Sequence, residues 1–126
     1  MTLTTAARDR LVADFLAAWN SQDVERLLDC YTDDVRYRDP NTRGDVVGRD
    51  ALRRYLTRLF AEWRMTWESR ETFTFDGTDG AAFLWRATLR RNDSDRTVAI
   101  EGMDLAVLRG GKVARNEVYF DRSLVA

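Results

Sequence analysis

The spacing of the apolar residues changes once along this chain, near Met65, and that change limits the possible folds more than any other feature. Before Met65, apolar side chains recur three and four residues apart, the spacing of one helical face. After it, they alternate with polar side chains at the period of two that a strand requires. Helices followed by consecutive long strands predict an α+β domain, with three N-terminal helices packed on one side of a curved antiparallel sheet.

Helix caps and turn residues give approximate element boundaries. Thr4 or Thr5 can cap the first helix, Asp23 a short second helix, and Asp50 a third helix whose inner stripe runs from Leu52 to Trp63. Gly- and Asp-rich turns separate the strands. Strands are expected at residues 35–39, 65–75, 81–91, 97–108 and 113–121, whereas residues 46–48 are too few to assign.

The composition indicates one globular domain that covers residues 1–126. Twenty basic and twenty-one acidic residues are interspersed, so nucleic acid is not an expected partner. No apolar run is long enough for a membrane span, and the charged first ten residues do not resemble a signal peptide, so a cytoplasmic protein is expected. Every basic residue except Lys112 is arginine, a bias typical of GC-rich bacterial genomes.

The chain contains no histidine, which limits the chemistry that it can perform. Imidazole acid/base catalysis, Ser-His and Cys-His pairs and most zinc sites are excluded. Proton transfer must then use Asp, Glu, Tyr or water. Residues 76–79 and 93–95 lack the spacing and closing Glu of a calcium loop, so neither a metal nor a cofactor is expected. The single cysteine, Cys30, is interpreted as helix packing rather than as a nucleophile.

Asp39 is the first candidate catalytic residue. In an extended segment Val35, Tyr37 and Asp39 share one face, so the carboxylate follows the apolar side chains inward. Pro40 should end the strand and leave Asp39 at the mouth of a cavity, where a half-enclosed carboxylate can exchange protons. The alternative is a turn in which the Asp39 side chain caps its own backbone.

Asp104 is the second candidate. It lies on the same strand face as Ile100 and Ala106, so it is expected to be enclosed. A buried acid must be protonated or paired with a cation, and Arg86 or Arg115 on neighbouring strands are the possible partners.

The strand that carries Asp104 is apolar on both faces. Met103, Leu105 and Val107 point away from the side that carries Asp104. A second subunit is the simplest cover for such a face, so a homodimer through the outer face of the sheet is expected.

Six segments together resemble the nuclear transport factor 2-like (NTF2-like) superfamily, and within it the SnoaL-like polyketide cyclases and bacterial ketosteroid isomerases. They are FLAAWNSQD at 15–23, YTDDVRYRDP at 31–40, GRDA at 48–51, GMD at 102–104, GKV at 111–113 and VYFD at 118–121. The resemblance covers roughly residues 8–121 and implies a cone-shaped α+β barrel. The fold hosts both enzymes and noncatalytic binding proteins, so function must be argued from the site.

The resemblance also implies roles for individual residues. Asp39 matches the general base of the isomerases, and Asp104 matches a protonated Asp that donates a hydrogen bond to the developing oxyanion. Phe15 stands where the isomerases have an oxyanion-hole Tyr, and Phe cannot donate. The loss of one such donor typically costs about 10²–10³ in rate. Tyr37, Tyr55 or Tyr119 are the alternative sources of a hydroxyl.

The expected pocket lining is aromatic and suits a flat, apolar ligand. It comprises Phe15, Trp19, Tyr37, Tyr55, Leu59, Trp63, Trp85 and Tyr119, although each could simply pack in the core. The leading hypothesis is a cofactor-independent isomerase or cyclase that transfers protons next to a carbonyl of a steroid- or polyketide-like compound. A noncatalytic small-molecule or protein-binding module is the alternative. Hydrolysis of an epoxide or lactone ranks third, because it needs an Arg between the two acids.

Overall fold

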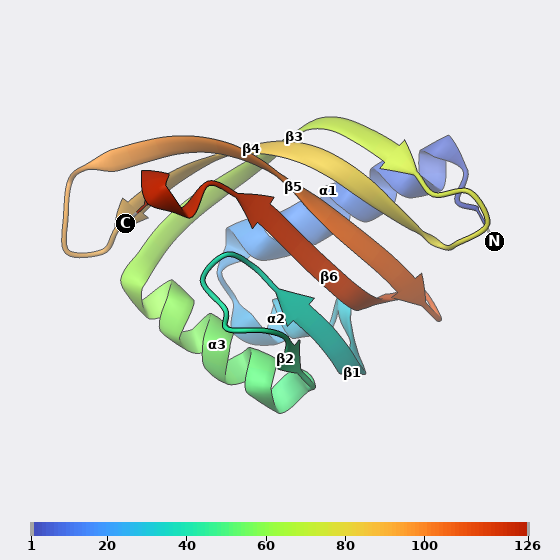
Figure 1. The fold of residues 1–126 in the computed structure, drawn as a ribbon, viewed down its shortest axis with the longest axis horizontal. Coiled ribbons are helices and arrows are strands. Elements are labelled where there is room, and N and C mark those ends of the chain that lie inside the picture. The colour runs from blue at the N-terminus through green and yellow to red at the C-terminus, as the bar shows by residue number, and fades with distance from the viewer. Residues whose placement is uncertain (1, 126) are drawn as a thin grey trace.

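The computed structural model describes residues 2–125 as helices packed on a six-stranded curled sheet (Figure 1). The predicted α+β class is confirmed. The elements in chain order are α1 (Thr5–Ser21), α2 (Val24–Leu28), β1 (Tyr31–Arg38), β2 (Val46–Val47), α3 (Arg49–Glu62), β3 (Trp63–Thr74), β4 (Gly80–Arg91), β5 (Thr97–Arg109), β6 (Lys112–Phe120) and the 3₁₀ turn η1 (Arg122–Leu124).

Two of the predicted helix caps are present. The Thr4 side chain accepts a hydrogen bond from the Ala7 amide at 3.1 Å, and Asp23 accepts one from the Arg26 amide at 3.2 Å. Each satisfies a backbone donor that the first turn of a helix leaves unpaired.

The predicted cap of α3 is wrong. The helix begins earlier, after Gly48, and Asp50 lies in its first turn, where it pairs with Arg53 at 2.7 Å. Trp63 is not a helical residue but the first residue of β3, and Cys30 lies in the turn after α2 rather than in a helix. Burial raises the pKa of the Cys30 thiol, which favours the packing interpretation.

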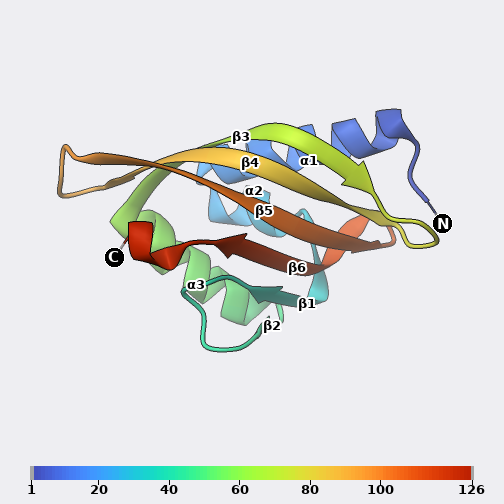
Figure 2. The same cartoon turned by 45° about the horizontal axis from the view of Figure 1, so that its top comes forward.

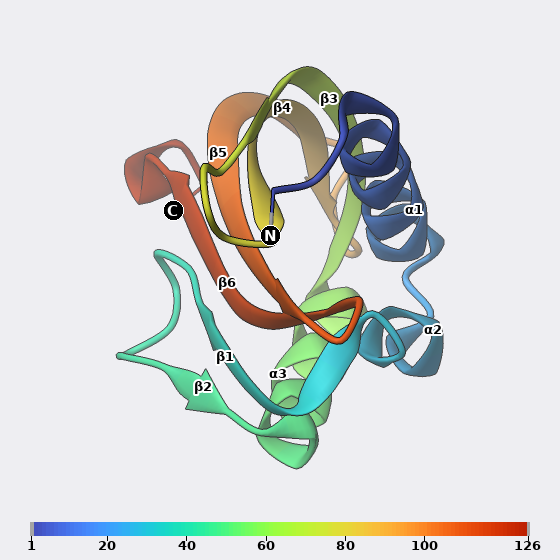
Figure 3. The ribbon, with the colours of Figure 1, turned by 90° about the vertical axis from the view of Figure 1, so that its right-hand side faces the viewer.

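The sheet has the strand order β2-β1-β6-β5-β4-β3 and is open, because β2 and β3 form its edges. All neighbouring strands are antiparallel except β1 and β6, which run parallel. Figures 2 and 3 show how β3, β4 and β5 arch over the helices while β6 and β1 complete a cone around the interior. No helix in the described range of 2–125 is long and apolar enough to cross a membrane.

The end of α1 is tied to the edge strand β3. The Asn20 amide donates to the Trp67 carbonyl at 3.0 Å and accepts from the Trp67 amide at 2.7 Å. Gln22 binds the carbonyl of Trp63 and the amide of Met65 in the same way. These side chains pair backbone groups that an edge strand otherwise exposes, and they hold Trp19 against the sheet.

Two register shifts change which side chains face inward. The β3–β4 register shifts between Ser69 and Glu71, so Phe73 pairs with Ala82 and lies 46% exposed rather than on the same face as Trp67. The β5–β6 register shifts between Arg115 and Val113. A bulge adds one residue to a strand and reverses the alternation beyond it.

The core lies between the concave face of the sheet and the helices. Its fully buried side chains include Leu27, Leu28, Tyr31, Val35, Leu52, Leu56, Phe83 and Trp85. The apolar faces of the helices therefore close one end of the cone, and the aromatic residues beside them enclose the cavity described next.

Candidate functional site

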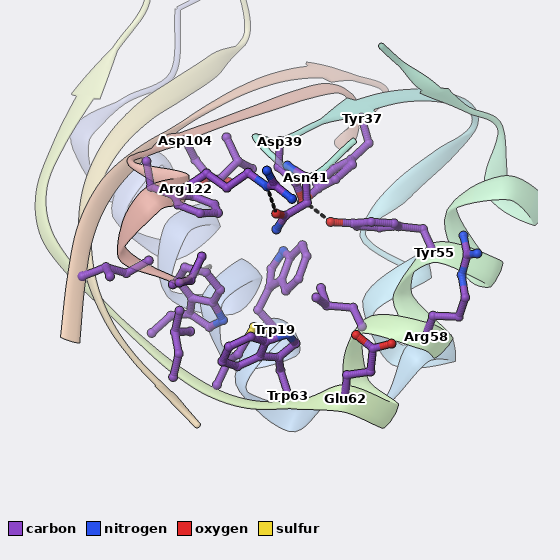
Figure 4. A pocket seen from close by; sticks show the side chains of 18 of the residues that line it. Trp19, Tyr37, Asp39, Asn41, Tyr55, Arg58, Glu62, Trp63, Asp104 and Arg122 are labelled. Carbon is purple, nitrogen blue, oxygen red and sulfur yellow. Dashed lines mark hydrogen bonds between the residues drawn. The ribbon is translucent and has the colours of Figure 1, made fainter. Parts of the chain in front are cut away.

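One cavity of about 430 Å³ opens inside the cone. Residues from α1, β1, α3 and all four long strands line it, as does the C-terminal turn (Figure 4). The lining consists of Leu16, Trp19, Tyr37, Asp39, Asn41, Tyr55, Arg58, Leu59, Glu62, Trp63, Met65, Trp67, Leu89, Arg91, Ile100, Asp104, Val118, Phe120, Arg122 and Val125. The wall is mainly aromatic and aliphatic, with a few polar groups, which is the usual character of a small-molecule site.

The structure brings both predicted acids to this cavity, together with most of the predicted lining. The lining residues that were predicted and are present are Trp19, Tyr37, Tyr55, Leu59 and Trp63. Trp19 packs against Tyr37 and Trp67, with ring centroids 6.2 and 6.0 Å apart. The aromatic wall is therefore a connected set of rings.

Three residues that were expected in the lining lie elsewhere. Phe15 is 2% exposed and packs edge-on against Tyr31 and Phe83 in the core. Trp85 is completely buried behind the cavity wall. Tyr119 is 49% exposed on the outer face, opposite Met103, because the shift in β6 reverses the alternation.

Asp39 combines the two alternatives that the sequence left open. Its Oδ1 accepts hydrogen bonds from the backbone amides of Asn41 at 2.7 Å and Thr42 at 3.1 Å, as expected of a turn. Its Oδ2 faces the cavity and accepts from the hydroxyls of Tyr37, at 2.7 Å, and Tyr55. The turn therefore holds one carboxylate oxygen in place and presents the other to the cavity.

The two tyrosines that bind Asp39 remain donors. Burial, followed by the negative charge of Asp39, raises the pKa of Tyr37 well above its ordinary value. The same two causes raise the pKa of Tyr55. Both hydroxyls therefore keep their protons at neutral pH, and neither contacts Asp104 through a hydrogen bond.

Asp104 occupies a different environment. It is 6% exposed, its Oδ1 accepts from Trp85 Nε1 at 2.7 Å, and its Oδ2 accepts from Asn116 Nδ2 at 3.0 Å. Burial raises the pKa of Asp104 to about 7, and the charge of Asp39 adds to the rise, while the two hydrogen bonds oppose it. At neutral pH a large fraction of this carboxyl is protonated.

The alternative in which Asp104 pairs with Arg86 or Arg115 is wrong. Arg86 is exposed and pairs with Glu68 at 3.5 Å, and Arg115 pairs with Glu117 at 2.5 Å. Both arginines lie on strand faces that point away from the cavity, because their neighbours in the strands face inward. No described residue within 2–125 forms a salt bridge with Asp104, and neither Arg86 nor Arg115 is the arginine between the two acids that the third-ranked hydrolase hypothesis requires.

Gly102 explains how Trp85 reaches Asp104. The two residues are opposite one another in the β4–β5 ladder, and a Cβ at position 102 would lie 2.5 Å from the indole ring. The missing side chain leaves room for the indole to lie across β5, so that its Nε1 reaches the carboxyl two residues further along.

Comparison with known proteins shows which family the chain belongs to. A family model described as SnoaL-like domain matches residues 12–116. The chain belongs to the SnoaL-like family. The resemblance to SnoaL-like proteins stated from the sequence is thus confirmed for most of the chain.

Solved structures show that this SnoaL-like chain has the NTF2-like α+β cone fold. A proposed polyketide cyclase from Xanthomonas campestris pv. campestris is 20% identical, with 96% of this chain and 98% of that chain covered and a TM-score of 0.81. An NTF2-like protein from Burkholderia xenovorans LB400 is 22% identical, with 97% and 95% covered and a TM-score of 0.76. TerC, co-crystallised with polyporic acid, is 18% identical, with 93% of each chain covered and a TM-score of 0.78.

Sequence reasoning missed several residues of this SnoaL-like site. Asn116 is fully buried and binds Asp104, yet its neighbours in the sequence, Arg115 and Glu117, are charged. Arg122 also lines the cavity, and its Nε donates to the Asn41 side chain at 2.9 Å, joining the C-terminal turn to the loop after β1. A possible signal for Asn116 was the buried acid of the GMD segment, Asp104. A buried carboxyl requires a polar partner, and the neighbouring strand β6 could supply one.

Proposed function

We propose that this protein is a cofactor-independent isomerase or cyclase that transfers protons next to a carbonyl group of a flat, mostly apolar substrate of the steroid or polyketide type. One observation carries the proposal: two carboxyl groups in contrasting environments, Asp39 and Asp104, line the same aromatic cavity. Titratable groups whose environments differ in this way are suited to separate roles as base and acid.

Asp39 is the proposed base. Its cavity-facing Oδ2 lies beside Tyr37 and Tyr55, at the end of β1. A carboxylate has about four acceptor positions, and the four hydrogen bonds to Asp39 occupy them. Removal of a proton from a substrate carbon therefore requires one tyrosine hydroxyl to turn away. Tyr55 is the better candidate, because it is only partly buried, whereas Tyr37 is enclosed.

Asp104 is the proposed oxyanion donor. When the base removes a proton next to a carbonyl, negative charge develops on the carbonyl oxygen. A protonated carboxyl in a buried site can donate to that oxygen without carrying a charge of its own. The enolate is then reprotonated at another carbon by the acid form of Asp39, which restores both groups.

The proposed ligand follows from the walls. Trp19, Trp63 and Trp67 present flat rings, while Leu59 and Ile100 add aliphatic surface. Such a wall favours a planar, apolar molecule with one carbonyl group. TerC is a structural neighbour that was crystallised with polyporic acid, which agrees with small-molecule binding in this fold.

Deuterium uptake tests the proposal without the natural substrate. Cyclic ketones and polyketide-like aromatics are incubated in D₂O with the wild type or with Asp39→Asn, and NMR follows the carbon next to the carbonyl. The wild type should accelerate exchange and Asp39→Asn should not, whereas Asp93→Asn, which removes an exposed charge in the β4–β5 turn, should match the wild type. Equal rates for the wild type and Asp39→Asn would refute the assignment of the base.

A noncatalytic binding module is the second candidate, and two observations favour it. Phe15 supplies no hydroxyl and lies outside the cavity, and every acceptor position of Asp39 is occupied. Quenching of tryptophan fluorescence by the same compounds, without any deuterium uptake, would support this function over catalysis.

We also propose that the protein forms a homodimer through the outer face of its sheet. On this face Met103 and Leu105 of β5 lie opposite Leu84 and Ala82 of β4, and Tyr119 of β6 is beside Met103. These neighbouring apolar side chains extend over three strands, with Glu117 opposite Leu105, and such a surface suits a second copy of the same surface. Leu105→Arg should convert the dimer to a monomer in sedimentation experiments, and a wild type that sediments as a monomer would contradict the proposal.

A further inference from the structure

We propose that Asn116 is a positioning residue that turns the proton of Asp104 toward the cavity. The inference deepens the proposed function and rests on the role of Asp104 as a hydrogen-bond donor. The side chain of Asn116 does not line the cavity. In this inference it nevertheless controls the direction in which Asp104 can donate a hydrogen bond.

The orientation of the Asn116 amide is fixed by a backbone carbonyl. Both hydrogens of Nδ2 are used, one toward Asp104 Oδ2 at 3.0 Å and one toward the Leu105 carbonyl at 3.1 Å. A carbonyl oxygen can only accept, so a flipped amide would set two acceptors against each other at Leu105. The nitrogen of Asn116 must therefore face Asp104.

Tyr31 completes the arrangement from the other side. Its hydroxyl, fully buried in the core, donates to Asn116 Oδ1 at 2.8 Å. Burial, and next the charge of Asp104, raises the pKa of Tyr31 well above its ordinary value, so the hydroxyl keeps its proton. A hydroxyl can rotate, so Tyr31 satisfies the amide oxygen but does not by itself determine which end of the amide faces Asp104.

These contacts leave Asp104 with donors as its hydrogen-bonding neighbours. Trp85 Nε1 can only donate, and the fixed amide of Asn116 also donates. Across residues 2–125, no other side chain hydrogen-bonds to the Asp104 carboxyl, so neither of its side-chain partners can accept its proton. Because Asp104 lines the cavity, we infer that a ligand oxygen there would receive the proton.

Two bicyclic probes of similar shape test this directly. 1-Tetralone carries a carbonyl acceptor and tetralin does not, and the ratio of their affinities, measured by tryptophan fluorescence, reports donation by Asp104. In Asn116→Asp the new carboxyl can accept the proton of Asp104, so the preference for tetralone should fall about tenfold while the tetralin affinity stays unchanged. Asn116→Ala, which removes the fixed donor, should lower the same ratio.

Tyr31→Phe is the matched control. This variant keeps the aromatic ring at position 31 and the hydrogen bond from Asn116 to the Leu105 carbonyl. The ratio of tetralone to tetralin affinity should therefore change by less than twofold. An unchanged ratio in both Asn116 variants would overturn the inference, and so would a wild type with no preference for tetralone. An equal loss in Tyr31→Phe would also overturn it, because the carbonyl of Leu105 would then not fix the amide. Deuterium uptake is a separate readout: a shifted ratio without exchange supports the positioning role and contradicts only the proposed catalysis.

Discussion

Substitution of Asp104 by Asn should change stability in a direction that depends on pH. The pKa of Asp104 in the folded protein is raised to about 7, whereas an Asp in an unfolded chain titrates near about 3.9. Between these values the folded protein holds a proton that the unfolded chain has lost. Stability conferred by Asp104 is therefore fully present below about pH 4 and declines by about 1.4 kcal/mol per pH unit until about pH 7.

The magnitude follows from the two pKa values. The ionised state of wild-type Asp104 costs about 4 kcal/mol of stability above pH 7. Asn at this position avoids that cost, but its NH₂ group must face a donor, either Trp85 Nε1 or Asn116 Nδ2, at roughly 1–3 kcal/mol at every pH. Asp104→Asn should thus be no more stable than the wild type at about pH 4.5 and clearly more stable at about pH 8.5.

Urea denaturation of both proteins at the two pH values measures the effect. The difference in unfolding free energy should move by about 3 kcal/mol in favour of the variant as the pH rises. Asp93→Asn removes a charge at an exposed turn and should show no comparable change. If the difference in unfolding free energy between the two proteins were the same at both pH values, the idea that Asp104 is a buried acid without a salt-bridge partner would be refuted.

Three further predictions concern other parts of the molecule. Gly102→Ala should destabilise the fold by about 2–3 kcal/mol, because the new Cβ would lie 2.4 Å from a backbone carbonyl of β6. Gly110→Ala, in an open turn, should cost about 1 kcal/mol. Denaturation measures both changes. Tyr37→Phe should lower the free energy of unfolding by about 1–3 kcal/mol, because the Tyr37 hydroxyl binds a carboxylate from a fully buried position. Tyr55→Phe should lower it by less. Cys30, whose thiol pKa is raised, should react more slowly with Ellman's reagent at about pH 8 than free cysteine does.

The sequence predicted best those features that depend on local alternation. The predicted faces of β4 and β5 agree with the observed burial, which is why Asp104 and the inward side chains around it were identified. Asp39 was also identified from a short-range rule, since it follows Tyr37 by two residues and precedes Pro40. The turn and the cavity were considered as alternatives, but a carboxylate has two oxygens and can serve both.

Features that depend on bulges and distant pairing were not predictable in this way. A bulge in β6 sends Tyr119 outward and brings Asn116 inward, and no residue type nearby marks it. The parallel pairing of β1 with β6 joins segments about eighty residues apart, so no local pattern encodes it. The partners of Asp104 were missed for the same reason: the neighbouring strands were known, but their register was not.

The contrast between the two acids arises from where each lies on its strand. Asp39 comes just after β1 ends, where free backbone amides and two tyrosine hydroxyls can reach it. Asp104 lies inside β5, where neighbouring strands use the backbone amides and only side chains can bind the carboxyl. The strand end therefore supplies backbone donors to Asp39, whereas burial within the strand raises the pKa of Asp104 and favours its neutral form. In the proposed mechanism, the same residue type would serve as base and as acid in one cavity, without histidine, because the fold places one copy at a strand end and the other within a strand.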